Sequence, residues 1–270
     1  MSLVVNTNVA SLNAQRSLSS SGAELKTAME RLSSGKKINS AADDAAGFAI
    51  AERMTAQIRG LNMATKNAND GLSMLAVIEN ATNDVTDMLQ RMRELAIQAA
   101  NDTNGSADRG FLQSEVSQLV QEIDRVATQT QYNGETILNG SFTDKKIQVG
   151  TEAGQTVGFS VSSITSNSLG VSSLDVSSDP TNALASITNA IESVAGDRAS
   201  YGALQNRLEY TVSNLMNVAE FTTSARSRIE DADFAAESAR LAKAQVLQQT
   251  GTAMLAQANA SPKLALSLIK

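Results

Sequence analysis

Apolar residues recur every three or four positions over a long stretch of the chain. The spacing runs from Gly47 to Ala99 and predicts one coiled-coil-like helix, about 80 Å long at roughly 1.5 Å per residue. A second apolar stripe lies on a neighbouring face, so we expect at least two partner helices. The first stripe comprises Ile50, Met54, Gln57, Leu61, Ala64, Ala68, Gly71, Leu75, Ile78, Thr82, Val85, Leu89, Met92, Ala96 and Ala99, and the second Met74, Ala81, Met88 and Leu95.

Turn-forming residues then interrupt the pattern. Segment 101–108 is rich in Asn, Asp and Gly, and a new apolar stripe follows from Leu112 to Val126, so the sequence predicts a helical hairpin. Beyond Gln131 the pattern is typical of β-hairpins, with Asn-Gly turns and short alternating runs. The turns lie at 133–134 and 139–140, and the runs at 146–149 and 156–161.

A second long helix is predicted after an irregular connection. Residues 162–179 are rich in Ser and Asn, and Asp179 followed by Pro180 is typical of a helix start. Heptad spacing returns from Leu184 to Ala219, interrupted by Arg198 and Gln205. We expect these two polar residues to set the register of the helix against its partner.

Both ends of the chain carry an apolar stripe where most domains have a polar tail. A single helix would leave its stripe exposed, so the two terminal helices are expected to pair and to bury the rest against copies of themselves. The sequence therefore predicts a mainly α fold, with long antiparallel coiled-coil-like helices from both chain ends, a small β-hairpin region in the middle, and assembly into a polymer. The packing residues are Leu18, Leu25, Met29, Leu32, Leu241, Leu247, Met254, Leu255, Leu264 and Leu268.

Composition narrows the possible functions. The net charge is -6, and no basic run exceeds the pairs Lys36–Lys37 and Lys145–Lys146, so neither nucleic acid nor a membrane is an expected partner. The chain has no Cys and no His, which excludes Cys/His metal sites and the usual nucleophilic triads. We expect no catalytic residue, metal or cofactor. The N-terminal segment also lacks the features of a conventional secretory signal.

Acidic residues cluster at two places near the ends of the chain, and a paired-carboxylate catalytic or metal site has to be considered there. With no His in the chain, a structural role is favoured: Ser40 followed by Asp43 resembles a capping box, and acidic residues complement a helix N-terminus. Phe48 and Phe234 are expected to make apolar contacts that hold these junctions in place. The predicted junction residues are Ser40, Asp43, Asp44, Phe48, Asp231, Asp233 and Phe234.

Five glycines lie inside the predicted helices: Gly22, Gly60, Gly71, Gly202 and Gly251. Each costs about 1 kcal/mol relative to Ala, and close approach of helices is the simplest reason for them. The alternative is that small residues let subunits slide between nearly equivalent packings.

Several ordered motifs resemble bacterial flagellin. The resemblance covers roughly residues 1–140 and 181–270. It is carried by 33–50 (SSGKKINSAADDAAGFAI), 58–61 (IRGL), 67–73 (NANDGLS), 227–235 (SRIEDADFA) and 245–259 (QVLQQTGTAMLAQAN).

The resemblance implies a structural subunit of the extracellular flagellar filament. Residues 1–40 and 229–270 would form an inner coiled-coil domain, and 41–180, with the hairpins, and 181–228 an outer helical domain. The family implies secretion by flagellar type III export, a chaperone that binds the C-terminal region, and contacts with cap and hook-junction proteins. A hook–filament junction protein is the alternative. An inserted catalytic domain or a lipid-coating helix is disfavoured by the short middle and by the acidic charge.

Two further likenesses concern immune recognition. Segment 89–98 resembles the part of flagellin engaged by the vertebrate Toll-like receptor, which implies contacts by Arg91, Leu95 and Glu115; the alternative is a solvated helix face with an Arg91–Glu94 pair. The apolar tail around Leu264 and Leu268 resembles the end sensed by cytosolic inflammasome receptors, although packing of an inner tube is its ordinary role. O-linked glycans on loop 160–178 are a further possibility.

Overall fold

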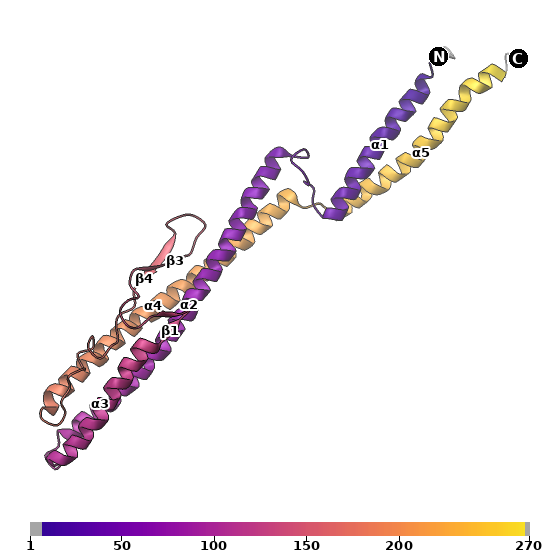
Figure 1. The fold of residues 1–270 in the computed structure, drawn as a ribbon. Helices are drawn as coiled ribbons and strands as arrows, with labels where there is room; N and C mark the ends of the chain where they lie inside the picture. The colour runs from indigo at the N-terminus through magenta and orange to yellow at the C-terminus, as the bar shows by residue number, and fades with distance from the viewer. Residues whose placement is uncertain (1–6, 268–270) are drawn as a thin grey trace. The chain divides into compact units, whose positions relative to one another are not determined.

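This computed structural model describes residues 7–267, with side chains as far as Ser261. The described residues form long helices and two small antiparallel hairpins (Figure 1), which confirms the predicted fold class. They divide into a terminal unit, up to Ala56 and from Phe221 onward, and a central unit, Gln57–Glu220. The elements are α1 (Val9–Ser34), α2 (Ala45–Ala99), α3 (Ser106–Gln129), β1 (Gln131–Tyr132), β2 (Glu135–Thr136), β3 (Lys145–Gln148), β4 (Thr156–Phe159), α4 (Pro180–Glu230) and α5 (Phe234–Ser267).

The apolar stripe of α2 is the spine of the central unit. From Leu61 to Ala99 every predicted position of the first stripe is buried, whereas Ile50 and Gln57, nearer the start of the helix, are exposed. The neighbouring stripe packs as well, with Leu95 buried and Met88 half-buried. Helices α3 and α4 complete this core through Val116, Ile123, Ile187, Val194 and Leu208. The two faces of α2 thus have the partner helices that its sequence predicts.

Polar contacts fix how α4 lies against α2. The helix begins at Pro180, as predicted, and the Asp179 carboxylate accepts a hydrogen bond from the Asn182 backbone N–H at 3.1 Å. Further along, the Arg198 guanidinium donates to Glu79 Oε1 of α2, with the Nη2 to Oε1 distance at 2.7 Å. This pair supports the predicted register role of Arg198; the same role for Gln205 stays a prediction.

The two hairpins follow the turn signals. Strands β1 and β2 pair around Asn133 and Gly134, whose φ angles of 50° and 82° match the left-handed turn that an Asn-Gly pair favours. Strands β3 and β4 pair with Ile147 opposite Val157. Strand β4 ends at Phe159, two residues before the predicted limit. Val161 instead donates its N–H to the carbonyl of Phe142 at 3.0 Å.

The connection 162–179 is irregular, as predicted, and α3 holds it in place. The Gln113 side chain donates to the Leu174 carbonyl at 2.8 Å and accepts from the Val176 N–H at 2.7 Å. Asp124 accepts from both the N–H and the hydroxyl of Ser166, each at 2.8 Å. Because these side chains satisfy backbone groups that no sheet pairs, the segment can bury apolar residues without regular structure.

Candidate functional site

Helices α1 and α5 lie side by side and antiparallel in the terminal unit (Figure 1). The seam follows the predicted stripes, and Gly251 packs on Leu18: a Cβ added at Gly251 would lie 3.4 Å from Leu18 Cδ1. Gly251 thus faces the partner helix, but a Cβ there would make only an ordinary van der Waals contact, and Gly22 and Gly202 have open space around them. Close helix approach does not explain these three glycines. The half-buried seam residues include Leu18, Leu25, Leu32, Leu241 and Leu255.

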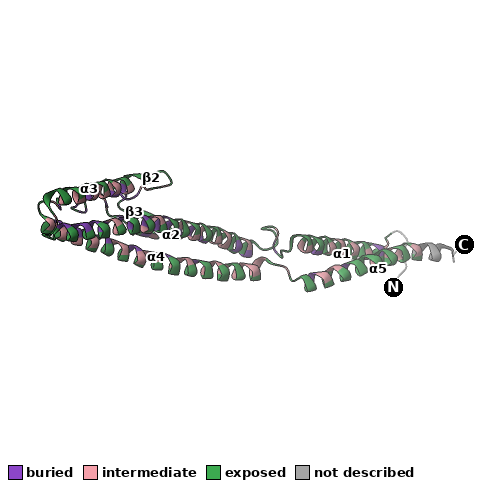
Figure 2. Cartoon of the chain, turned by 90° about the horizontal axis from the view of Figure 1, so that it is seen from below, coloured by how far each residue is buried: buried purple, intermediate pink, exposed green. Residues whose placement is uncertain are grey.

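The pair leaves much of its apolar surface uncovered. Figure 2 shows α1 and α5 largely in the colours of exposed and intermediate residues. Predicted packing residues Met29, Leu247 and Met254 are 49%, 39% and 64% exposed, so pairing alone does not bury them. Val9, Leu12 and Val246 are also exposed. Of the remaining predicted residues, Leu264 lies in α5 beyond the described side chains, and Leu268 lies outside the described residues.

Polar groups lock the register of the pair at both ends. Asn8 caps α1, because its Oδ1 accepts from the Ser11 N–H, and its Nδ2 donates to the Ala258 carbonyl of α5 at 2.7 Å. At the opposite end Glu237, only 5% exposed, lies 4.0 Å from an Arg31 nitrogen and 3.1 Å from an Arg240 nitrogen. A slip by one helical turn would break the two contacts that join the helices, the bond from Asn8 to Ala258 and the Arg31–Glu237 pair.

The chain crosses between helices at a small backbone junction. Helix α1 ends at Ser34, and the following Gly35, with a φ of 71°, caps it in the left-handed conformation. An isolated antiparallel bridge then joins Lys36 to Asp231. It comprises a bond from Lys37 N–H to the Glu230 carbonyl at 2.6 Å and one from Ala232 N–H to the Gly35 carbonyl at 2.9 Å.

The acidic junction residues act on the backbone, but the predicted capping box is wrong. Helix α2 begins at Ala45, and Asp44 caps it by accepting from the Gly47 N–H at 3.0 Å. Asp233 caps α5 in the same way through the Ala235 N–H at 2.9 Å. Ser40 lies in the preceding turn, where its N–H and hydroxyl donate to the Asp43 carboxylate. The backbone donors in this turn lower the pKa of Asp43.

The apolar residue that is buried at the junction is not one of the two predicted. Phe234 is 72% exposed and Phe48 is half-buried, whereas Ile38 is 3% exposed. Ile38 packs on Gly47, where an added Cβ would lie 2.7 Å from Ile38 Cδ1. The sequence carried this signal, because Ile38 is the one aliphatic residue within the otherwise polar segment 33–40.

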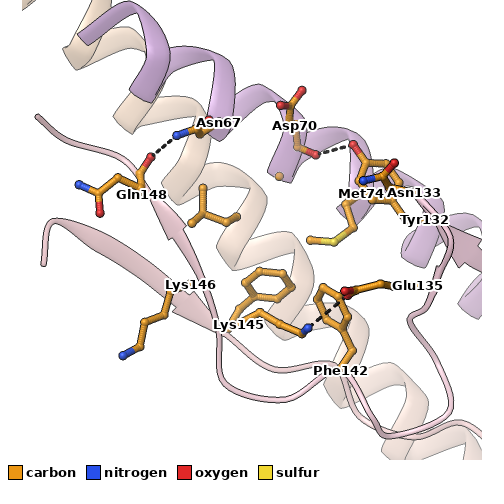
Figure 3. Close-up of a pocket in the computed structure, with 13 residues that line it drawn as sticks. Asn67, Asp70, Met74, Tyr132, Asn133, Glu135, Phe142, Lys145, Lys146 and Gln148 are labelled. Atoms are coloured by element: carbon orange, nitrogen blue, oxygen red, sulfur yellow. Dashed lines mark hydrogen bonds and ion pairs between the residues drawn. The ribbon is translucent and has the colours of Figure 1, made fainter. Parts of the chain in front are cut away.

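A cleft of about 510 Å³ lies between α2 and the two hairpins of the central unit (Figure 3). Asn67 donates to the Gln148 carbonyl at 3.1 Å, and the Tyr132 hydroxyl to the Asp70 carbonyl at 3.2 Å. Lys145 is neutralised by Glu135 at 3.2 Å, while Lys146 points away. The bonds of Asn67 and Tyr132 hold the hairpins on α2, and the Lys145–Glu135 pair joins the two hairpins to each other.

The hairpins also explain two of the glycines. A Cβ added at Gly71 would lie 2.4 Å from Ile147 Cδ1, and one at Gly60 would lie 2.8 Å from Thr151 Cγ2. The close approach at these positions is therefore by the β3–β4 hairpin and its loop, whereas the prediction was close approach of another helix. Sliding between equivalent packings stays a prediction.

The residues of the predicted receptor surface lie on α2 and α3. Arg91 pairs with Glu115 at 2.8 Å and with Glu94 at 3.0 Å, so the predicted Arg91–Glu94 pair is confirmed. Hydrogen bonds to Glu115 and then Glu94 raise the pKa of Arg91. Leu95, by contrast, is 1% exposed and belongs to the core. A protein partner could reach Arg91 and Glu115 directly, but not the Leu95 side chain.

Side chains that could hold a metal ion do not gather in the described part of the chain, where no group of three or more His, Cys, Asp or Glu occurs. A helix long and apolar enough to cross a membrane is likewise not found among the described residues.

Comparison with known protein families identifies the family to which the chain belongs. A family model for the bacterial flagellin N-terminal helical region matches residues 5–143, and one for the bacterial flagellin C-terminal helical region matches residues 184–269. The chain belongs to the bacterial flagellin family. Flagellins are the subunits that polymerise helically into the flagellar filament for motility, and this flagellin is such a structural subunit.

Individual relatives agree along the whole chain. This flagellin is 39% identical to a flagellin of Halalkalibacterium halodurans, with 99% of the chain and 100% of the relative covered. It is 40% identical to the flagellar filament 33 kDa core protein of Treponema phagedenis, at the same coverage. The crystal structure of Bacillus cereus flagellin is similar at 30% identity with a TM-score of 0.51, over 56% of this chain and 88% of that one.

Proposed function

We propose that this filament subunit polymerises through the apolar surface that α1 and α5 leave exposed after pairing. The observation that carries the proposal is the exposure of Val9, Leu12, Met29, Val246, Leu247 and Met254 on a helix pair that is otherwise well bonded. A large apolar surface that remains exposed on a folded unit marks a site of association. The packing role that the sequence predicts for Leu264 and Leu268 stays a prediction, because the structure describes neither side chain.

The energetics favour a polymer with several neighbours per subunit over a simple dimer. Fully burying a Leu, Val or Met side chain contributes about 1.5–3 kcal/mol, so covering these half-exposed residues contributes roughly 1 kcal/mol each. One pairwise contact reaches only some of them. Association costs about 4–15 kcal/mol in lost freedom, so a single contact is weak, and several contacts made by one subunit in a helical lattice stabilise it.

The rest of the proposal assigns the layers and partners. Residues 1–40 and 229–270 form the inner layer of the filament, and residues 41–180 and 181–228 the outer layer, with the junction residues fixing the connection between them. The subunit has no catalytic role. It is secreted by flagellar export with a chaperone on the C-terminal region, and it meets cap and hook-junction proteins at the ends of the polymer. The family resemblance supports these assignments.

A host Toll-like receptor is proposed as a partner of the central unit. Arg91 and Glu115 supply the direct contacts, since their ion pair lies at the surface of α2 and α3. Leu95 contributes by packing beneath them, which holds α2 in position. Nothing observed favours the alternative of a hook–filament junction protein over the filament subunit.

Seeded polymerisation of the full-length chain tests the proposed surface. We compare Leu12→Gln/Leu247→Gln with Leu12→Met/Leu247→Met, because Gln and Met have similar shapes and differ in polarity. The Gln variant should need a several-fold higher protein concentration to elongate seeds, and the Met variant should behave like the wild type. Equal elongation by the Gln variant would contradict the assigned surface, provided that circular dichroism shows the same helix content in all three proteins.

A further inference from the structure

Three Asn-Gly pairs give the central unit three positions at which the backbone can react with a side chain. In such a pair the backbone nitrogen of the Gly can attack the Asn side-chain amide, because Gly has no side chain that shields its nitrogen. The reaction needs only water as a second reactant, so the local structure decides which pair reacts first. The pairs are Asn104–Gly105, Asn133–Gly134 and Asn139–Gly140.

Hydrogen bonds hold the first pair at both reacting groups. The Asn104 side-chain nitrogen donates to the Gln98 carbonyl at 2.6 Å. The Gly105 N–H donates to the Asp108 carboxylate at 3.2 Å, at the start of α3. Both bonds must break before the Gly105 nitrogen can reach the Asn104 side chain, so the fold protects this pair.

The third pair is held in a different way. The Asn139 side-chain oxygen accepts from the Ser141 N–H at 3.0 Å and from the Ser141 hydroxyl at 2.6 Å. Gly140 is also packed, since a Cβ added there would lie 3.1 Å from Ser163 Cβ. The fold therefore restrains both the side chain and the backbone of this pair.

The second pair lies free at the tip of the β1–β2 hairpin. Both residues are exposed, and neither the Asn133 side-chain amide nor the Gly134 N–H has a hydrogen-bond partner among the described residues. A Cβ added at Gly134 would meet nothing within 4 Å. Ring closure requires the peptide between the two residues to rotate, which converts a type I′ turn into a type II′ turn. Two-residue hairpins accept both turns, so the strands can stay paired during this rotation.

We propose that Asn133 is a self-modifying site that converts with time into aspartate and isoaspartate. The Gly134 nitrogen attacks Asn133 Cγ, an N–Cγ bond forms and the Cγ–Nδ2 bond breaks. Ammonia leaves with the proton of the Gly134 N–H, and a five-membered succinimide remains. Water then opens the ring at one of its two carbonyl carbons, which gives aspartate or isoaspartate without any change of oxidation state.

Isoaspartate would disturb the contacts that hold this hairpin on α2. It inserts one methylene group into the backbone of a two-residue turn, across which Tyr132 pairs with Glu135. The Tyr132 hydroxyl donates to the Asp70 carbonyl of α2 at 3.2 Å, and Glu135 pairs with Lys145 at 3.2 Å (Figure 3). A change of register at the turn displaces both side chains. The hairpin of an old subunit should therefore lie more loosely on α2 than that of a new one, however the subunit polymerises.

The test ages three full-length proteins in parallel: the wild type, Asn133→Gln and Asn133→Asp. The Gln side chain would have to close a six-membered ring, which forms far more slowly, and Asn133→Asp carries the new charge on a normal backbone. Each protein is kept in a mildly alkaline buffer, where the attacking nitrogen loses its proton more readily, and in an acidic buffer as a control. Peptide mass spectrometry measures conversion at every Asn-Gly pair, an isoaspartyl methyltransferase assay measures isoaspartate, and hydrogen exchange follows residues 131–136.

Conversion should be fastest at Asn133. Breaking one hydrogen bond slows ring closure by about fivefold, so Asn133, which breaks none, should convert roughly 25-fold faster than Asn104 or Asn139, which each break two. Hydrogen exchange at 131–136 should become several-fold faster in the aged wild type. Ageing should leave exchange in Asn133→Gln unchanged, and fresh Asn133→Asp should exchange like the fresh wild type.

Four results would overturn the proposal. Conversion of Asn133 no faster than that of Asn104 and Asn139 would refute the assigned site. Unchanged exchange at 131–136 in converted wild type, or equal acceleration in aged Asn133→Gln, would refute the effect on the hairpin. Fast exchange in fresh Asn133→Asp would show that the charge acts and not the inserted methylene. Each result leaves seeded polymerisation as a separate question, because the hairpin lies outside the surface assigned to assembly.

Discussion

Replacing Leu95 by Ala should destabilise the central unit strongly. The side chain is 1% exposed in the core shared by α2, α3 and α4, and the change removes three carbon atoms. At about 0.8 kcal/mol per buried methylene the lost transfer free energy is about 2.4 kcal/mol. The cavity left behind adds to it, so the total is about 3 kcal/mol, within the range of roughly 2–5 kcal/mol for such changes.

The matched control is Ile97→Ala, two residues further along the same helix. Ile97 is 55% exposed, so its loss should cost less than about 1 kcal/mol. Urea unfolding of the monomer, followed by far-ultraviolet circular dichroism, measures both. If Leu95→Ala unfolds within about 1 kcal/mol of Ile97→Ala, the assignment of Leu95 to the core is wrong, and a direct receptor contact by this side chain becomes the better explanation of its place in the motif.

Three further outcomes are expected. Gly71→Ala should lower the free energy of unfolding by about 1–3 kcal/mol, because the added Cβ would clash with Ile147. Gly202→Ala has open space around it and should raise the free energy of unfolding by up to about 1 kcal/mol. Equal effects of the two changes in urea unfolding would contradict the hairpin packing. Gln113→Ala should expose the backbone of 174–176 to faster hydrogen exchange and cost roughly 1–3 kcal/mol, and unchanged exchange there would count against it. Burial raises the pKa of Tyr201, so the stability that its neutral phenol contributes is fully present below the ordinary pKa of about 10 and is lost as the pH rises through the raised pKa. The difference in phenolate absorbance between wild type and Tyr201→Phe should therefore titrate above about pH 10. A midpoint at or below the ordinary pKa would contradict the burial of this side chain.

Local sequence rules predicted most helices of this fold because periodicity and turn chemistry act over a few residues. The spacing that begins at Gly47 gave α2 to within two residues, and Asp179–Pro180 marked the start of α4. The Asn133–Gly134 pair located a hairpin turn. Each of these signals is complete within its own segment and needs no knowledge of the partner that packs on it.

The misses concern residues whose role depends on distant partners. The sequence predicts that Gly71 contacts another helix, but the Ile147 side chain fills the space above Gly71. No local sequence rule connects these two residues. Phe234 was predicted to be buried because it is aromatic, yet Ile38 occupies the buried position at the junction. Ser40 and Asp43 have the spacing of a cap, but their turn ends before α2 begins, and Asp44 caps the helix.

The hydrogen bond from Asn8 to the Ala258 carbonyl joins residues that are 250 positions apart in sequence. Contacts of such long range form only after the entropy of closing a very large loop has been overcome. Helix α1 therefore stays without its partner until the 34 residues of α5 are available. While the chain is still being synthesised, its N-terminal segment has no partner helix to pack on. The last segment to be synthesised therefore determines when the terminal unit can fold.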